Sequence, residues 1–375
     1  MKIRAAVLEE IGTPRPYAET KPLKIQELDL DPPGEGEVLV KVAAAGLCHS
    51  DLSVINGDRP RPTPMALGHE AAGVVAELGP GVDDLAVGDH VVLVFVPSCG
   101  HCRPCAEGRP ALCEPAAKAN AAGEMLGGGR RLHRDGQDVH HHLGVSCFAD
   151  HAVCSRRSLI RIDKAVPLEQ AALFGCAVQT GVGAVVNTAH VPAGSDVAVV
   201  GLGGVGLNAL LAAKLSGAAR IVAMDLLDDK LALARQLGAT HTVNAGYADA
   251  ADQVRAATDG GADFAFEMAG SVPALDLAYK VTRRGGTTVT AGLANPDKRL
   301  ELAPVSLVAE ERTLKGSYIG SCVPVRDIPR FLTLFRQGQL PVDRLMSERV
   351  TLDTLNESFD RLADGGTVRQ VLTFD

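Results

Sequence analysis

The sequence lacks both an excess of positive charge and any apolar run long enough to cross a bilayer. Its 375 residues carry a formal net charge of −8, and no stripe of lysine or arginine offers the basic footprint typical of nucleic-acid binding. The apolar residues 197–200 end at Gly201, far short of the roughly 20 that a membrane-spanning helix needs. The N-terminal segment turns polar at Glu9, too early for the apolar core of a signal peptide. We therefore expect a cytoplasmic protein that binds neither nucleic acid nor membrane.

Cysteine, in contrast, is well represented, and four of the nine cysteines form one cluster. The spacing C-x2-C-x2-C-x7-C lets four thiolates converge on one tetrahedral cation, and these thiolates belong to Cys99, Cys102, Cys105 and Cys113. A closed, all-sulfur shell suits a structural Zn²⁺. Disulfide pairing is the alternative in an oxidising compartment. An iron–sulfur cluster is the competing metal, although ferredoxins use other spacings. We predict a structural zinc in a lobe at about residues 95–115.

The pattern of apolar residues changes twice along the chain. Residues 3–89 show short β-branched runs cut by glycine and proline, which predict a β-rich region. From Ser195, strand-like runs alternate with helix-like runs, which predict βαβ units and a parallel sheet. After about Tyr318 the pattern is mixed again, with a helix expected near residues 328–337 and a last strand at 370–374.

Residues 116–144 have the composition of a polar, glycine-rich loop that contains the histidine tract His140, His141 and His142. A histidine tract can bind metal. In a loop of this composition, however, we expect the three side chains to lie on a solvated surface.

A glycine-rich turn follows the predicted strand at residues 196–200 and opens a helix. In the pattern G-x-G-x-x-G, Gly201 allows the tight turn, Gly203 lets the backbone approach a pyrophosphate, and Gly206 lets the helix pack on the strand. Gly204 and Val205 lie between them, and the amides of this helix N-terminus would face the phosphates. The alternative is a glycine turn in an unrelated α/β domain.

The strand after this helix ends in Asp225. A carboxylate at this position accepts hydrogen bonds from the adenosine ribose of NAD and repels the 2′-phosphate of NADP. Lys230 either adds a contact to the same ribose or is a solvated helix lysine. We therefore predict NAD as the cofactor.

Three further candidate metal ligands stand far apart in the sequence, namely Cys48, His69 and Cys176. Two thiolates and one imidazole leave a fourth position open for water or substrate, as a catalytic zinc requires. Because buried cysteines are also common packing residues, the spacing alone leaves both interpretations open.

The chain resembles the zinc-dependent medium-chain alcohol dehydrogenases from about residue 3 to its last strand. The resemblance is carried by Cys-His-Ser-Asp at residues 48–51, Gly-His-Glu at 68–70, the four-cysteine cluster, Gly175-Cys176, the glycine turn and Val368-Arg369. It is closest to the long-loop members, which are class III-like or act on aryl and allyl alcohols. It implies an α/β fold in which a Rossmann doubly wound parallel sheet, residues 179–318, is inserted into a β-rich GroES-like catalytic domain formed by residues 1–178 and 319–375.

The resemblance also implies two zinc ions per chain. The catalytic zinc would be bound by Cys48, His69 and Cys176, and the structural zinc by the four-cysteine cluster. Asp51 would hydrogen-bond and orient His69, and Glu70 would lie close behind the metal.

The remaining roles that the resemblance implies concern the cofactor. Thr180 and Val205 would pack against the nicotinamide, and His49 and Arg369 would contact the pyrophosphate. The glycine turn, Asp225 and Lys230 would bind the rest of NAD.

The implied reaction interconverts a primary aliphatic, allylic or aromatic alcohol and its aldehyde, with hydride transfer to and from NAD. Ser50 would begin a proton relay, since its hydroxyl can accept from the alcohol while donating to the cofactor ribose. Many family members end this relay in a histidine where this chain has Ser53. Exit of the proton through His49 or bulk water therefore stays open.

Two other functions are alternatives to this alcohol dehydrogenase: an enzyme with a different substrate, and a protein without catalytic activity. A formaldehyde dehydrogenase that acts on an S-hydroxymethyl thiol adduct would need an arginine near residues 114–117, which read Glu-Pro-Ala-Ala, although an acidic residue remains at Asp58. A zinc-stabilised NAD-binding protein without catalysis would have lost Cys48, His69, Cys176 or Ser50, and all four are present.

The expected partners are a small-molecule alcohol or aldehyde and a second copy of the chain. Family members that keep a long loop after the structural cysteines tend to be dimers, with a tetramer as the alternative. We expect a homodimer joined through edge strands around residues 302–318.

Overall fold

The computed structural model describes residues 1–374, whose strands form three sheets. The chain divides into two units. The first contains Met1–Cys176, Val323–Arg336 and the residues from Val342 onward, and the second contains Ala177–Cys322 and Gln337–Pro341. The first unit is therefore discontinuous in sequence, whereas one uninterrupted segment supplies nearly all of the second.

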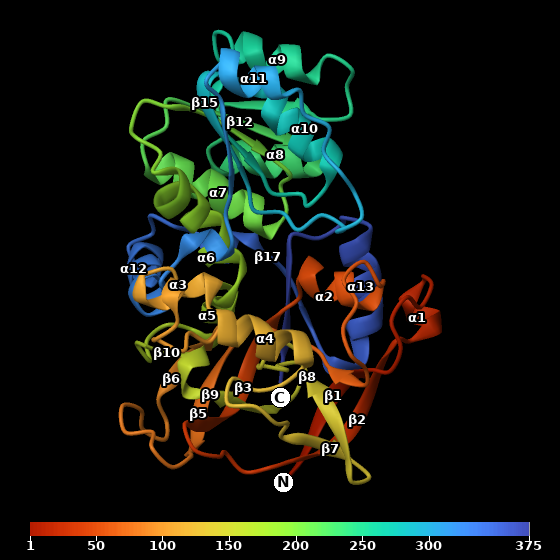
Figure 1. Ribbon diagram of the computed structural model, residues 1–375. Helices are drawn as coiled ribbons and strands as arrows, with labels where there is room; N and C mark the ends of the chain where they lie inside the picture. The colour runs from red at the N-terminus through yellow and green to blue at the C-terminus, as the bar shows by residue number, and fades with distance from the viewer. Residues whose placement is uncertain (375) are drawn as a thin grey trace. The chain divides into compact units, whose positions relative to one another are not determined.

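Two sheets belong to the first unit (Figure 1). One is a closed barrel with the strand order β1-β2-β7-β8-β4, formed by β1 (Lys2–Leu8), β2 (Leu23–Leu30), β4 (Met65–Ala66), β7 (Leu132–Arg134) and β8 (Gln137–His141). The other has the order β10-β6-β5-β3-β18-β17, with β9 also paired to β3. Its strands are β3 (Glu37–Gly46), β5 (Ala71–Leu78), β6 (His90–Leu93), β9 (His151–Ser155), β10 (Leu159–Ile162), β17 (Met346–Val350) and β18 (Arg369–Thr373).

Side chains that alternate between the two faces of the barrel strands form part of the core of this unit. Ile3, Ala5 and Val7 of β1 are buried together with Leu28 and Leu30 of β2, because every second side chain of a strand points to the same face. β3 is apolar and buried along most of its length, as expected for a strand that pairs with β5, β9 and β18.

The second unit contains a parallel six-stranded sheet with the order β13-β12-β11-β14-β15-β16. Its strands are β11 (Asp196–Val200), β12 (Arg220–Asp225), β13 (His241–Asn244), β14 (Ala262–Glu267), β15 (Thr282–Thr290) and β16 (Thr313–Gly316). The direction of the strand order reverses between β11 and β14, and ligands of doubly wound sheets bind at the carboxyl ends of the strands at this point.

Helices cover both faces of this parallel sheet (Figure 1). The right-handed crossovers of parallel sheets place α7 and α8 on one face, where they contact each other, and α9 and α10 on the other, where they also pack together. The helices of the second unit are α6 (Ala177–Gly183), α7 (Gly204–Leu215), α8 (Asp228–Leu237), α9 (Ala250–Ala257), α10 (Val272–Val281) and α11 (Pro304–Ala309). Those of the first unit are α1 (Tyr17–Thr20), α2 (His49–Ile55), α3 (Arg103–Ala106), α4 (Glu114–Ala122), α5 (Leu168–Ala172), α12 (Pro324–Arg336) and α13 (Leu355–Ala363).

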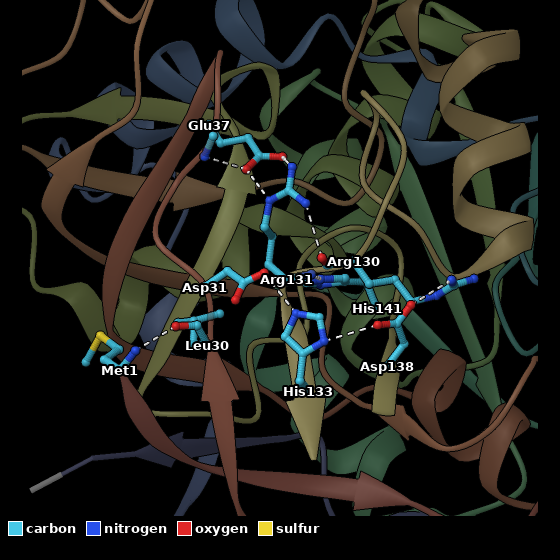
Figure 2. Close-up of polar contacts among 10 residues, drawn as sticks. Met1, Leu30, Asp31, Glu37, Arg130, Arg131, His133, Asp138 and His141 are labelled. Carbon is cyan, nitrogen blue, oxygen red and sulfur yellow. Dashed lines mark hydrogen bonds and ion pairs between the residues drawn. The ribbon is translucent and has the colours of Figure 1, made fainter. Parts of the chain in front are cut away.

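The expectation of a polar loop with solvated histidines at residues 116–144 is wrong. This segment contains most of α4 and the strands β7 and β8, and β8 closes the barrel by pairing with β4. His141 and His142 are each only 1% exposed. The Nε2 atom of His141 accepts a hydrogen bond of 3.0 Å from the backbone N–H of Arg131, whose guanidinium in turn binds the carboxylate of Glu37 (Figure 2). Burial lowers the pKa of His141 to about 3, so this imidazole is a neutral core group.

Over residues 1–374, no single helix has both the length and the apolar character to cross a membrane. One bent pair of helices, Leu168–Gly175 with Ala177–Ala189, meets the criterion by length and composition only.

Candidate functional site

The first unit brings together three side chains that lie far apart in the sequence, those of Cys48, His69 and Cys176. Their exposed fractions are 7%, 0% and 6%. Together with Glu70, they place one ligand atom each within 4.8 Å of all the others. Cys48 is the N-cap residue of α2, and its Sγ accepts the backbone N–H of Ser50 at 3.5 Å. The helix terminus thus fixes the sulfur in place.

The ring of His69 is held at one nitrogen only. Its Nδ1–H donates to Oδ1 of Asp51 at 3.0 Å, and Asp51 lies in the first turn of α2. Its Nε2 is buried and has no hydrogen-bond partner among residues 1–374. Because a buried polar atom without a partner is costly, this nitrogen is suited to ligate a cation.

The donor set fits zinc. Two sulfurs and one imidazole nitrogen are ligands that Zn²⁺ prefers. A hydrogen bond from the Cys176 thiol outweighs the effect of burial and lowers the pKa of Cys48 well below its ordinary value. A thiolate at this position is the form of cysteine that binds metal.

Glu70 and Arg369 form an ion pair beside these ligands, with exposed fractions of 0% and 4%. Burial of the pair is tolerated because each charge compensates the other. The structure therefore places the guanidinium of Arg369 against Glu70, while His49 lies exposed in the first turn of α2. The predicted contacts of Arg369 and His49 with a pyrophosphate stay a prediction.

The four clustered cysteines also converge. Their ligand atoms lie within 4.8 Å of one another, with Sγ of Cys102 3.9 Å from Sγ of Cys113. Burial opposes ionisation of Cys99, but backbone N–H groups from His101 and Cys102 outweigh it and lower the pKa of this thiol to about 6. The turns around α3 thus prepare a closed four-sulfur shell.

The second unit contains the predicted glycine turn, between β11 and α7. Gly201 has a φ of +92°, which favours glycine. A Cβ on Gly206 would lie 1.8 Å from the carbonyl oxygen of Gly201, so only glycine fits at the start of α7. Around Gly203 a Cβ would meet nothing within 4 Å, and its backbone is open to a ligand.

The other predicted cofactor residues surround this turn. Oδ2 of Asp225, at the end of β12, accepts the backbone N–H of Leu202 at 2.7 Å. Val205 lies in the first turn of α7, and Thr180, 8% exposed, lies in the neighbouring helix α6. Lys230 is half-buried in α8.

Sequence reasoning missed His142. Its Nδ1 lies 3.2 Å from the same Asp51 oxygen that binds His69, and its ring packs edge-on against that of His69, with centroids 5.5 Å apart. The available signal was the pair of apolar residues, Val139 and Leu143, that flank the histidines and are typical of a buried strand rather than a loop.

The chain matches two known domains. Residues 34–164 match the alcohol dehydrogenase GroES-like domain, and residues 204–337 match the zinc-binding dehydrogenase domain. The NDMA-dependent alcohol dehydrogenase of Amycolatopsis methanolica is 41% identical over 376 residues, which cover 99% of each chain.

Two solved structures share the fold over the whole chain. Benzyl alcohol dehydrogenase of Acinetobacter calcoaceticus is 34% identical with a TM-score of 0.93, covering 100% of both chains. A zinc-binding dehydrogenase of Sinorhizobium meliloti 1021, solved bound to NADP, is 27% identical with a TM-score of 0.80, again covering 100% of both. The chain therefore belongs to the zinc-dependent alcohol dehydrogenase family.

This membership confirms the predicted fold class, a Rossmann-type parallel sheet combined with a GroES-like domain. The protein is a zinc-binding alcohol dehydrogenase. The nucleotide cofactor, the substrate and the role of each residue belong to the proposal that follows.

Proposed function

We propose that the protein interconverts a primary alcohol and its aldehyde with NAD as the hydride carrier, at a catalytic zinc held by Cys48, His69 and Cys176. One observation carries this proposal. Three zinc-type ligands from distant parts of the chain meet in a buried cluster, and Nε2 of His69 has no hydrogen-bond partner among residues 1–374. A second, structural zinc would be held by the four-cysteine cluster, whose closed shell leaves no position for substrate.

Zinc bound by these ligands would supply a Lewis acid that lowers the pKa of an alcohol hydroxyl. The chain's own residues handle the proton. Ser50 lies in the first turn of α2, where its backbone N–H donates to Sγ of Cys48, and its hydroxyl would be the first proton acceptor. Ser53 donates its hydroxyl to the backbone carbonyl of His49 at 2.8 Å. With Ser53 engaged in this way, the exposed His49 is the better candidate for the proton's exit.

Glu70 and Arg369 would control the charge behind the metal. A carboxylate oxygen of Glu70 lies within 4.8 Å of the two cysteine sulfurs, and Arg369 forms an ion pair with this carboxylate. This pairing keeps a third negative charge from competing with the substrate oxygen for the cation.

NAD is favoured over NADP by Asp225. Its carboxylate stands at the end of β12, directly against the glycine turn at Leu202, where a 2′-phosphate would meet a like charge. The following residues, Leu226, Leu227 and Asp228, are exposed and supply no cation for a phosphate. Thr180 and Val205 would pack against the nicotinamide.

Apolar surroundings favour an uncharged substrate. The ring of Phe95 packs edge-on against His69, with centroids 5.1 Å apart. The likeness to a benzyl alcohol dehydrogenase supports an aromatic or allylic alcohol. Residues 114–117 begin α4 and contain no arginine that could hold a glutathione carboxylate.

Metal analysis and steady-state kinetics test the proposal together. We expect two zinc ions per chain and reduction of NAD by benzyl alcohol, with much lower activity on S-hydroxymethylglutathione. Because one relative is NDMA-dependent, each assay should be run with and without NDMA. One zinc per chain, or no hydride transfer to added NAD, would contradict the proposal.

A further inference from the structure

A buried carboxylate stands at the switch point of the parallel sheet. Glu267 is the last residue of β14, and it is in register with Val200 of β11 on one side and with Thr290 of β15 on the other. It is only 1% exposed. Because burying a carboxylate is costly unless hydrogen bonds compensate it, the partners of this group define what it does.

Three short hydrogen bonds compensate the charge of Glu267. Its Oε1 atom accepts the backbone N–H groups of Ala269 and Gly270 at 2.8 and 2.6 Å. Its Oε2 atom accepts the hydroxyl of Thr290 at 2.7 Å. Hydrogen bonds to a charged acceptor are stronger than those between neutral groups. The carboxylate therefore ties the loop that follows β14, residues 268–270, to the end of β15.

The loop at residues 268–270 lies directly against the glycine turn. A Cβ on Gly201 would be 2.8 Å from the backbone nitrogen of Ala269. The loop that follows β15 is equally close, since a Cβ on Gly292 would be 2.2 Å from the backbone nitrogen of Gly270. The N–H of Gly292 also donates to the carbonyl oxygen of Glu267 at 3.3 Å. Glu267 thus organises both loops, one through its carboxylate and the other through its carbonyl.

These two loops belong to one half of the nucleotide site. The strand order β13-β12-β11-β14-β15-β16 consists of two mononucleotide-binding halves that meet at the switch point. Asp225 ends β12, in the half that would bind the adenosine. Glu267 and Thr290 end strands of the other half, which would bind the nicotinamide mononucleotide.

A glycine-containing loop is held in one conformation only if something fixes it. Gly270 has a φ of +73°, and glycine loses more conformational freedom on ordering than any other residue. If this loop were free, the cofactor would have to order it, and that cost weakens binding. The hydrogen bonds of Glu267 order the loop before the cofactor binds.

We propose that Glu267 and Thr290 are positioning residues for the nicotinamide half of the cofactor. The Thr290 hydroxyl fixes the carboxylate of Glu267, and the carboxylate holds residues 268–270 against the glycine turn. The inference rests on the proposed function, because it assumes that NAD binds at this turn. Both residues act through the backbone of the loop. Their loss should therefore weaken the binding of NADH and spare a ligand that fills the adenosine half alone.

The test compares the Kd of NADH with the Kd of AMP, which reaches only the adenosine half. Thr290→Val keeps the shape of the side chain and removes its hydroxyl. We expect this change to raise the Kd of NADH about tenfold, because the lost hydrogen bond goes to a charged group. The Kd of AMP should stay unchanged. Fluorescence titration measures the first value, and calorimetry measures the second.

Thr288→Val is the matched control for the loss of a hydroxyl. Thr288 lies in the same strand, is 0% exposed, and shares a hydrogen bond of 2.7 Å with the hydroxyl of Thr282 instead of Glu267. This variant removes an equally buried hydroxyl from β15 without releasing the loop. It should leave the Kd values of NADH and AMP unchanged.

Substitutions of Glu267 supply a second measurement. Glu267→Ala removes all three hydrogen bonds and should raise the Kd of NADH more than Thr290→Val does. Glu267→Gln should restore most of the lost affinity, because the amide oxygen still accepts from the loop and the amide nitrogen can donate to the Thr290 hydroxyl. In the Glu267→Ala background, Thr290→Val should have no further effect, because residues that act through one network are not additive.

The outcomes are distinct. Equal effects of Thr290→Val and Thr288→Val on NADH, a parallel loss of AMP affinity, or additivity with Glu267→Ala would each overturn the positioning role alone. A wild-type chain that does not bind NADH would overturn the proposed function and this inference together.

Discussion

At the residue scale, Asp225 is the group that decides between the two nicotinamide cofactors. We expect the wild type to prefer NAD by at least about tenfold in kcat/KM, since this needs only about 1.4 kcal/mol of like-charge repulsion. Asp225→Gly should weaken NAD binding and reduce the preference for NAD over NADP in kcat/KM. It should not produce an efficient NADP enzyme, because it adds no cation for the phosphate. Initial rates with both cofactors measure this, and comparable wild-type efficiency with NADP would refute it.

The two cysteine clusters should respond differently to the loss of one sulfur. Cys176→Ser should abolish turnover, because it removes a ligand of the catalytic zinc, yet leave a folded protein that binds NAD. Cys102→Ser should lower the Tm by several degrees, about 2–4 °C for each kcal/mol lost, because a closed zinc site stabilises the fold directly. Thermal melts and turnover of both variants check the assignment, and the opposite pattern would show that the two roles are exchanged.

Residues that belong to a short sequence motif could be predicted. Residues whose role depends on a contact with a distant part of the chain could not. The four-cysteine spacing and the glycine turn are read within a few positions. The match to the family brought Cys48, His69 and Cys176 into one hypothesis. His142 could not be predicted as part of the site because its contact with Asp51 joins the end of β8 to α2. Nothing in the histidine tract itself indicates that this contact forms.

At the scale of elements, a polar network ties the barrel strands together. Glu9 follows β1, and its carboxylate accepts hydrogen bonds from Gln26 of β2, at 2.7 Å, and from Arg134 of β7. The hydrogen bond from Arg134 is the main reason why the pKa of Glu9 lies below its ordinary value. The network therefore adds stability above the unfolded-state pKa of about 4.3 and loses it as the pH falls through the folded-state value.

Glu9→Gln should show this dependence. We expect the variant to be less stable than the wild type by up to about 1 kcal/mol at pH 7, because the pair is partly exposed and screened. The difference should shrink as the pH falls below about 4.3 and vanish only below the folded-state pKa, where the carboxyl of the folded wild type is also protonated. Urea unfolding at pH 7 and at several lower pH values measures it. Glu10→Gln, an exposed neighbour, is the control, and a constant difference across this range would contradict the linkage.

The elements of the second unit were more predictable than those of the barrel. Strands such as β11 and β12 are continuous apolar runs next to a glycine turn. By contrast, β4 and β7 are very short, and their pairings with β8 and β2 join segments far apart in the chain. Strands of this length carry too little pattern to be distinguished from loop.

At the scale of the whole molecule, the edge of the parallel sheet is the expected dimer contact. All four residues of β16 are exposed, and next to it α11 exposes two apolar side chains, Val305 at 69% and Val308 at 79%. An open strand edge with apolar neighbours favours pairing with another chain. We predict a homodimer in light scattering at assay concentration.

A charge in this surface should separate the subunits. Val308→Asp should shift the mass toward the monomer, because a carboxylate would be buried without a partner. Val325→Asp is the matched control, since Val325 of α12 is also 69% exposed but lies in the other unit. A stable wild-type tetramer, or equal effects of both substitutions, would contradict the predicted contact.

The discontinuity of the first unit has a consequence for how the chain is made. β18 lies between β3 and β17 in its sheet, and Arg369 of β18 supplies the counter-charge of Glu70. Domains generally fold in the order in which the ribosome synthesises them, yet the unit that contains Cys48 and Glu70 cannot complete its sheet until β18 has been synthesised. The uninterrupted parallel-sheet segment can fold on the nascent chain first. The N-terminal half, although synthesised earlier, is completed only after β18 has emerged.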